Sequence, residues 1–163
     1  MSLSPLAMIT LDSVTHLTPA HRGAVVYAAS HGGTYAAAYA AAKGIAAIIL
    51  NDAGIGRERA GIAGLDLLGD LGVPGAAIAH TSARIGDGRD GVARGILSTV
   101  NASASALGLT IGMSCREALE RLAGAALNPA PTPPLGDEAR HEIASDVRPG
   151  AKVIVMDSAS LVT

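Results

Sequence analysis

Residues 44–52 read Gly-Ile-Ala-Ala-Ile-Ile-Leu-Asn-Asp, and every residue from Ile45 to Leu50 is apolar. A strand with one face in water alternates apolar and polar residues, whereas an unbroken apolar run is typical of a strand that helices cover on both faces. Such strands occupy the middle of parallel sheets. The stretch therefore predicts a central strand, followed at its carboxyl end by the polar residues Asn51 and Asp52.

The neighbouring segments repeat a strand-helix unit. Upstream, Ala24–Ala29 predicts a strand and Thr34–Lys43 a helix, which Gly44 ends in the left-handed conformation. Downstream, the apolar spacing of Ala60–Leu71 predicts a helix and Gly75–His80 another strand. Alternation in this order predicts a three-layer sandwich with a mainly parallel, Rossmann-like sheet of about five strands and right-handed crossovers.

The second half of the chain has a weaker pattern. A polar loop, Thr81–Asp90, is expected to lead into one helix that runs to about Leu107, because apolar residues recur there at helical spacing. Ser114 and Glu117 have the spacing of a capping box that opens a helix to about Leu127. The other expected elements are a fourth strand Leu109–Met113, a proline-rich connection at 128–134, a short polar helix Asp137–Ser145, and a last strand Lys152–Met156, either parallel or an antiparallel edge.

Composition limits the class of protein. The 163 residues fit a single α/β domain, and 49% apolar with 16% charged residues excludes an intrinsically disordered chain. A net charge of −2 and 2% aromatic residues argue against a nucleic-acid surface. The lone Cys115 and the absence of a signal-peptide pattern predict a cytoplasmic protein, and Ser, Thr and Asn interrupt the uncharged stretches, so no membrane span is expected. Apolar helices rich in Ala and Gly predict a homo-oligomer.

Parallel strands bring the residues that follow them to one edge of the sheet, and ligands bind there, near the point where strand order reverses. The polar segments that would lie at this edge are Ser30–Thr34, Asn51–Arg59, His80–Asp90, Ser114–Cys115 and Asp157–Ser158.

Three residues of these segments are the candidate catalytic groups: His31, Asp52 and His80. An imidazole titrates near neutral pH, and a carboxylate at a rigid strand end can act as a base or orient a histidine. Each also has a structural interpretation. Asp52 could bond its own loop in an Asx-turn, His31 could lie solvated beside a tight turn, and His80 could be an ordinary sheet-end residue.

Candidate substrate-binding residues surround these three. Glycine backbone at a helix start favours an anion or oxyanion, and arginine clamps carboxylate or phosphate, although the loop arginines could instead neutralise nearby aspartates. The set is Ser30, Gly32, Gly33, Asn51, Arg57, Arg84, Asp87 and Arg89.

Motif searches exclude several enzyme classes. The chain has no P-loop, no Gly-x-Ser-x-Gly elbow, no His-Glu-x-x-His and no paired cysteines for zinc, so we expect no metal. Residues 86–91 match Gly-x-Gly-x-x-Gly, but five residues separate them from the preceding strand and two carboxylates would repel a pyrophosphate. No cofactor is therefore expected.

The sequence thus favours a small cytoplasmic enzyme that acts on a compact anionic metabolite by non-redox hydrolase, lyase or isomerase chemistry. The alternatives are a non-catalytic small-ligand or anion-binding module and an oligomeric assembly subunit. On the enzyme hypothesis, His31, Asp52, His80 and at least one of Arg57, Arg84 and Arg89 line one cavity.

Overall fold

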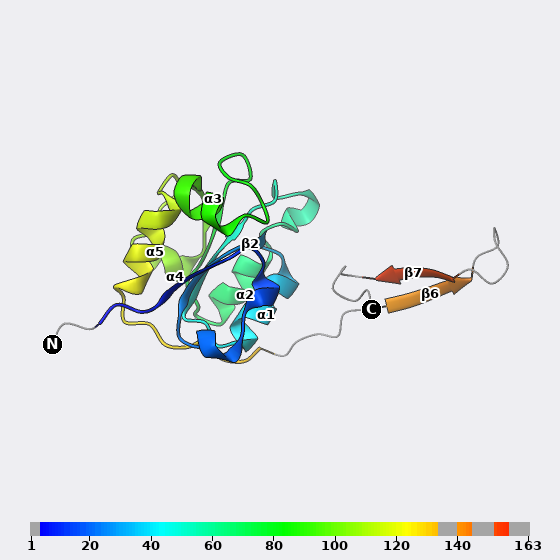
Figure 1. Ribbon diagram of the computed structural model, residues 1–163, viewed down its shortest axis with the longest axis horizontal. Helices are drawn as coiled ribbons and strands as arrows, with labels where there is room; N and C mark the ends of the chain where they lie inside the picture. Colours follow the sequence, from blue (N-terminus) through cyan, green and yellow to red (C-terminus); the bar gives the residue numbers. More distant parts are fainter. Residues whose placement is uncertain (1–3, 134–139, 145–151, 157–163) are drawn as a thin grey trace.

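A sheet of five strands forms the centre of the molecule in the computed structural model, which describes residues 4–133, 140–144 and 152–156 (Figure 1). Its strands, in spatial order, are β1 (Met8–Leu11), β2 (Val25–His31), β3 (Ala47–Asn51), β4 (Gly75–Ile78) and β5 (Leu97–Val100). The first four are parallel, and β5 runs antiparallel to β4. All five residues of β3 are buried, which confirms the predicted central strand.

Helices cover both faces of the sheet. One layer consists of α1 (Thr34–Ala42) and α2 (Gly64–Asp70), and the other of α3 (Gly88–Arg94), α4 (Ala102–Ala106) and α5 (Cys115–Ala123). Three short 3₁₀ segments, η1 (Val14–His16), η2 (Pro19–His21) and η3 (Arg57–Arg59), lie in the connections. Each layer encloses its own apolar cluster against the sheet. The predicted three-layer α/β architecture is confirmed.

The strand order corrects one part of the expectation. Because β1 to β5 are neighbours in the same order as in the chain, the described strands contain no point where the order reverses. The expectation that a ligand site lies at a reversal of strand order therefore does not hold for this sheet. The carboxyl ends of the four parallel strands nevertheless share one edge, and β5 begins at that edge.

The helix expected to reach Leu107 is wrong. This region instead holds α3, β5 and α4, so the apolar residues at helical spacing belong to three elements. Gly95 leaves helical geometry after α3 with φ −59° and ψ 136°, and Asn101 caps α4 by accepting a hydrogen bond from the Ala104 N–H at 2.9 Å. A helix break and a cap thus isolate the four residues that form β5.

The strand expected at Leu109–Met113 is also wrong. A turn at Ile111 and Gly112, with Gly112 at a φ of 91°, takes its place. Leu109 is buried, and Met113 is partly buried against the core. The place of this strand in the sheet is taken by β5 at one edge and by β1, which was not predicted, at the other.

The end of the described chain differs from expectation as well. The polar helix is wrong over Arg140–Ala144, which is a strand, β6, paired antiparallel with β7 (Lys152–Met156). The other residues of that predicted helix lie outside the described residues. The strand at Lys152–Met156 is confirmed, but it belongs to a separate two-stranded sheet.

The remaining predicted boundaries shift by a few residues. The helix expected at Ala60–Leu71 starts only at Gly64, and α5 ends at Ala123 rather than near Leu127. Residues 128–133 have no regular structure, and the Ala130 N–H donates to the Ile45 carbonyl at 2.8 Å, which ties this part of the proline-rich connection to the core. None of the described helices is long and apolar enough to cross a membrane.

Asn101 joins three elements through its side chain. Its Oδ1 accepts hydrogen bonds from the N–H groups of Gly75 and Ala104, and its Nδ2 donates to the carbonyls of Val73 and Leu65. The residue is buried, so each bond replaces one that water would otherwise make.

We expect Asn101→Ala to lower the free energy of unfolding by about 3 kcal/mol, because it removes a helix cap and leaves buried backbone groups unpaired. Ser114→Ala, which removes only the cap bond to the Glu117 N–H, should cost about 1 kcal/mol. Urea unfolding of the two variants measures the difference. Equal losses would contradict the structural role assigned to Asn101.

Candidate functional site

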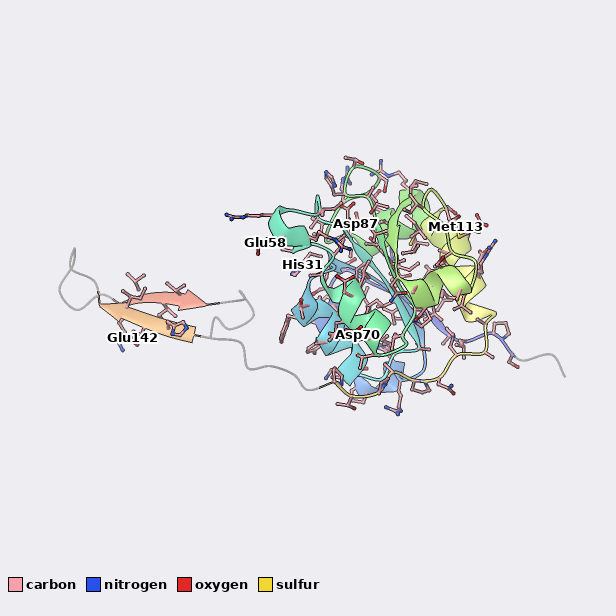
Figure 2. All side chains as sticks on the ribbon, turned by 180° about the vertical axis from the view of Figure 1, so that it is seen from behind. His31, Glu58, Asp70, Asp87, Met113 and Glu142 are labelled. Carbon is pink, nitrogen blue, oxygen red and sulfur yellow. The ribbon has the colours of Figure 1, made fainter. Side chains whose placement is uncertain are left out.

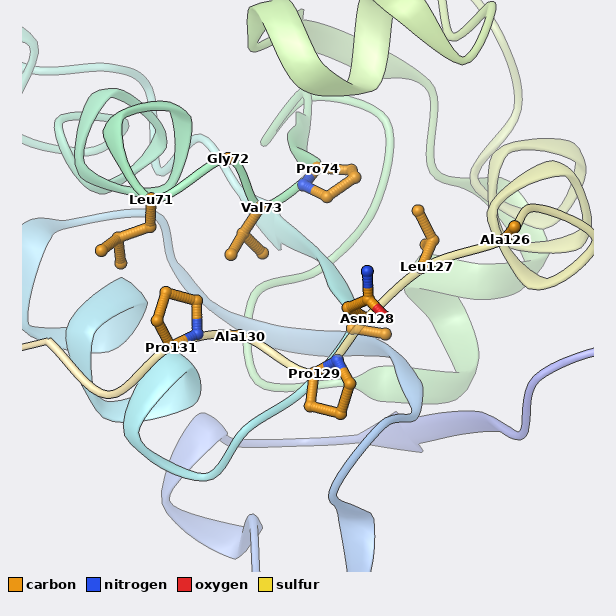
Figure 3. Close-up of a pocket in the computed structure, with 11 residues that line it drawn as sticks. Leu71, Gly72, Val73, Pro74, Ala126, Leu127, Asn128, Pro129, Ala130 and Pro131 are labelled. Atoms are coloured by element: carbon orange, nitrogen blue, oxygen red, sulfur yellow. The ribbon is translucent and has the colours of Figure 1, made fainter.

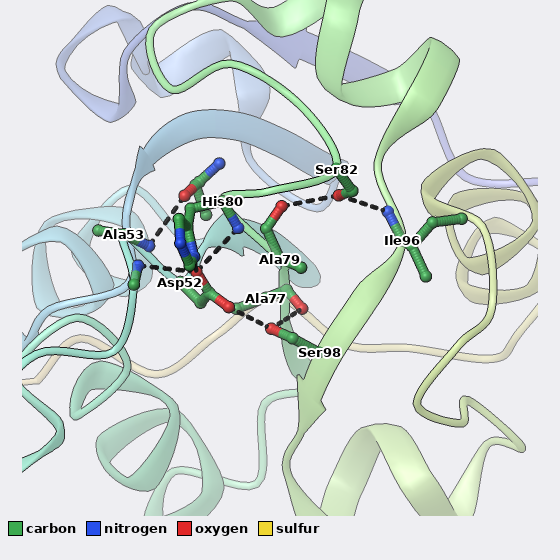
Figure 4. A network of polar contacts seen from close by, with 10 residues as sticks. Asp52, Ala53, Ala77, Ala79, His80, Ser82, Ile96 and Ser98 are labelled. Carbon is green, nitrogen blue, oxygen red and sulfur yellow. Dashed lines mark hydrogen bonds and ion pairs between the residues drawn. The ribbon is translucent and has the colours of Figure 1, made fainter.

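Asp52 follows the central strand directly and has the most densely bonded side chain at the carboxyl edge (Figure 4). Its Oδ1 accepts hydrogen bonds from the Gly54 N–H, the His80 N–H and His80 Nδ1, each at 2.9 Å. Its Oδ2 accepts a bond from the Ser98 hydroxyl at 2.8 Å. The carboxylate thus connects the loop after β3, the end of β4 and the start of β5.

The His80 ring lies at the surface with its orientation fixed by Asp52. Its side chain is 53% exposed, whereas that of Asp52 is 4% exposed. An ionised carboxylate only accepts hydrogen bonds, so Nδ1 of His80 must carry the proton that it donates. The neutral ring therefore presents an unprotonated Nε2, which is the arrangement of a histidine that acts as a general base.

The pKa of the Asp52 carboxyl lies below its ordinary value. Burial raises this pKa, but the N–H groups of Gly54 and His80, the Ser98 hydroxyl and the His80 ring together lower it by a larger amount. Asp52 is consequently ionised at neutral pH, and its charge stabilises the imidazolium that His80 forms when it takes a proton.

Strained backbone surrounds this pair. The described residues contain four non-glycine residues with positive φ, and all four lie in the loop after β3: Ala53 (48°), Ile55 (65°), Glu58 (57°) and Arg59 (59°). A β-branched residue such as Ile55 adopts this conformation at a cost of about 1–3 kcal/mol. Backbone bonds from Ile55 N–H to the Asp52 carbonyl, at 2.7 Å, and from Gly61 N–H to the Ile55 carbonyl, at 2.8 Å, hold the loop in place.

A cavity of about 170 Å³ opens beside His80. It is lined by His80, Thr81, Ser82, Ala83, Arg84 and Arg94. Asp90 holds the Arg94 guanidinium with two bonds, at 2.7 and 2.8 Å, while no ion pair of the Arg84 guanidinium occurs within the described ranges. Arg84 therefore has a charge available for a ligand at this cavity.

His31 lines a different cavity, of about 370 Å³, together with Ser13, Val14, Thr15, Ser30, Tyr35 and Ala36. Figure 2 shows His31 at the same end of the five-stranded sheet as Glu58 of η3 and Asp87. The Gly33 N–H donates to His31 Nδ1 at 3.1 Å, so the neutral ring carries its proton on Nε2. The two imidazoles thus have opposite tautomers and line two separate cavities, and Asp52 bonds to His80 but not to His31. The expectation that His31 and His80 line one cavity is therefore wrong.

The other predicted residues near His31 have backbone roles as well. Gly32 donates its N–H to the Asn51 carbonyl and accepts from the Gly64 N–H, both at 2.9 Å, which ties the loops after β2 and β3 together. Ser30 accepts from the Val14 N–H at 2.8 Å. Asn51 accepts from the Ala53 N–H, and its buried Nδ2 has no partner among the described residues. That Nδ2 is a donor adjacent to Asp52 in the chain.

The three remaining candidates, Arg57, Arg89 and Asp87, line neither the His80 cavity nor the His31 cavity. Arg57, with a side chain 94% exposed, lies 3.6 Å from the neighbouring Glu58, and Arg89 is exposed on α3. Asp87 caps α3 by accepting from the Asp90 N–H at 2.9 Å. Residues 86–91, which match Gly-x-Gly-x-x-Gly, thus include a capped helix start in which Asp87 has a structural role.

Sequence reasoning missed Ser98 and Arg94 as members of the site. Both lie in the region predicted as one long helix, where Ser98 would have faced no strand end. Gly95 and Asn101 carried a usable signal, because a glycine and a cap residue bracket the strand-like sequence Leu97-Ser98-Thr99-Val100.

A third cavity, of about 300 Å³, lies at the opposite edge of the sheet (Figure 3). It is bounded by the residues that precede β3 and β4 and by the segment Ala126–Pro131, and no titratable side chain lines it. Within the described residues no group of three His, Cys, Asp or Glu side chains could hold a metal ion. Acid-base chemistry is therefore best supported at Asp52 and His80.

No family model, no curated protein and no solved structure matches this chain.

Asp52→Asn should lower the free energy of unfolding at pH 7 by about 1–3 kcal/mol, because it weakens several buried hydrogen bonds to a charged acceptor. Since folding depresses the Asp52 pKa, its stabilisation is present above about pH 4 and is lost as pH falls through the folded pKa. The difference between wild type and variant should therefore shrink below pH 4 in urea unfolding. Asp66→Asn, at a side chain 67% exposed, is the control and should cost under about 0.5 kcal/mol. A pH-independent difference for Asp52→Asn would refute the role of its charge.

Proposed function

We propose that this chain is a small enzyme that transfers protons on a compact anionic molecule, with His80 as general base and acid and Asp52 as its orienting partner. The observation that carries the proposal is the 2.9 Å bond between Nδ1 of the half-exposed His80 and Oδ1 of the buried Asp52, beside a cavity that Arg84 also lines. Hydrolase, lyase and isomerase reactions of the non-redox kind all use such a positioned base.

Substrate size and charge follow from the cavity. Its volume of about 170 Å³ is below the roughly 300 Å³ at which pockets for drug-sized ligands begin, so a compact molecule fits best. The Arg84 guanidinium favours a carboxylate or phosphate group, which it binds through two hydrogen bonds.

Covalent catalysis by the nearby nucleophiles has less support. The Ser82 hydroxyl donates to the Ala79 carbonyl at 2.7 Å and accepts from the Ile96 N–H at 3.0 Å, so it is occupied in fastening the loop after β4. Burial raises the pKa of the Cys115 thiol to about 12, which removes the thiolate at neutral pH. Proton transfer by His80 without a covalent intermediate is therefore the simpler mechanism.

The lone cysteine favours a cytoplasmic location, which stays a prediction from composition.

A binding module without turnover is the second candidate, and the cavity at His31 is the observation that favours it. That cavity is larger than the one at His80, and the side chains around it include the hydroxyls of Ser13, Thr15, Ser30 and Tyr35 but no carboxylate. Its ligand would be held by neutral hydrogen-bond donors at the edge between β1 and β2.

The first test is a thermal-shift screen of small carboxylates and phosphate esters, followed by proton NMR of each hit in D₂O to detect turnover or exchange of a carbon-bound proton. A ligand at 100 times its Kd stabilises the folded chain by about 2.7 kcal/mol. We expect His80→Gln to reduce the rate by about 10²–10⁴-fold with a Kd within a few-fold of wild type, because it removes the base and keeps the backbone bond to Asp52. His31→Gln is the matched control and should keep the rate. Turnover that survives His80→Gln would contradict the proposal, and binding without any turnover would favour the binding module.

Arg84→Gln should weaken binding of the same ligand by about tenfold or more, because a bidentate charged contact is worth roughly 1.5–3 kcal/mol. Arg57→Gln removes an equal charge from an exposed loop position outside the cavity and should leave Kd unchanged. Isothermal titration of both variants separates a specific anion contact from a general charge effect. Equal losses in the two variants would exclude Arg84 as the anchor.

A further inference from the structure

The hairpin of β6 and β7 exposes an unusual amount of apolar surface. Four of the nine large apolar side chains that are exposed in the described structure belong to it: Ile143 (50%), Val153 (47%), Ile154 (36%) and Val155 (49%). Ile143 pairs with Val153, and His141 pairs with Val155. Because alternate residues of a strand point to the same side, the side chains of Ile143, Val153, His141 and Val155 share one face. The other face carries the ion pair between Lys152 and Glu142, at 3.0 Å, and Ile154.

A sheet of only two short strands is marginally stable in water and gains stability from additional strands. Both outer edges of this hairpin have no strand beside them among the described residues, so their N–H and C=O groups are open to pairing. Natural edge strands block such pairing with charges or proline. β7 carries one charge, Lys152 at its first position, which pairs with Glu142, and positions 153–155 contain neither a charge nor a proline.

The centre of β7 is self-complementary, and its end residues would place Lys152 opposite Met156. Val153-Ile154-Val155 reads the same in both directions, so antiparallel pairing about Ile154 places Val153 opposite a valine, and Val155 likewise. The same operation on β6 about its middle residue places Glu142 opposite Glu142, and like charges directly opposite destabilise a sheet. The β7 edge therefore fits a second copy, and the β6 edge does not.

We propose that β7 pairs antiparallel with β7 of a second copy of this chain, about a twofold axis through Ile154, and that the two hairpins join into one four-stranded sheet. This inference does not depend on the proposed function. It identifies the surface through which the chain forms a symmetric homodimer.

The test is the mass of the full chain in solution at micromolar concentration, measured by light scattering after gel filtration. We expect a dimer for wild type and a monomer for Ile154→Lys, which places two ammonium groups next to each other at the axis. Ile143→Lys puts the same charge on the outer strand and should leave the dimer intact. A monomeric wild type, an Ile154→Lys variant that stays dimeric, or dissociation by Ile143→Lys alone would each overturn edge pairing through β7.

Cross-linking decides the case in which both lysine variants dissociate because the hairpin itself unfolds. Ile154→Cys places one thiol on each side of the axis, at the 4.5–5.5 Å Cα separation of directly opposed residues, which suits a disulfide. Ile143→Cys is the control on the outer strand, and the native Cys115 is buried and gives little background. Mild oxidation should yield a covalent dimer from Ile154→Cys and little from Ile143→Cys on a non-reducing gel. Equal yields would refute the proposed axis.

Discussion

The Asp52 carboxylate accepts hydrogen bonds from three separate segments of the chain, and the carboxyl edge of the sheet is organised around it. A buried carboxylate without partners would cost several kcal/mol, so the charge is tolerated only where donors converge. The loop after β3 supplies Gly54, the end of β4 supplies His80, and the start of β5 supplies Ser98. Because these donors come from elements far apart in sequence, the carboxylate stabilises the same arrangement of strands that positions the His80 ring.

The loop after β3 shows what this arrangement costs. Four non-glycine residues in the left-handed region represent several kcal/mol of unfavourable backbone conformation, concentrated within seven residues of Asp52. Strain of this kind persists where surrounding bonds over-determine the structure, and the backbone bonds of Ile55 and Gly61 do so here. A sharply turned loop lets the Asp52 side chain bond its own backbone at Gly54 and also reach His80 and Ser98. The Asx-turn and the orienting role, which the sequence presents as alternatives, are therefore both present.

The centre of the fold could be predicted from sequence because burial on both faces leaves an unmistakable pattern. Local composition alone predicts three consecutive elements: the strand β2, the alanine-rich helix α1 and the buried strand at Ile45–Leu50. The region from residue 88 to residue 106 could not, because its apolar residues happen to recur at helical spacing while belonging to α3, β5 and α4. That error hid Ser98. The contact between Asp52 and His80 joins residues 28 positions apart, and it follows from parallel strands β3 and β4 being neighbours rather than from any local motif.

The most direct measurement of the account is the tautomeric state of the two histidines, read from ¹⁵N chemical shifts of the imidazoles at a pH where both rings are neutral. The hydrogen bond to Asp52 requires His80 to carry its proton on Nδ1, and the bond from Gly33 requires His31 to carry its proton on Nε2, so one spectrum contains both the test and its internal reference. We predict a Nδ1–H tautomer for His80 and a Nε2–H tautomer for His31. A Nε2–H tautomer at His80 would show that Asp52 does not orient the ring, and the acid-base site would be contradicted.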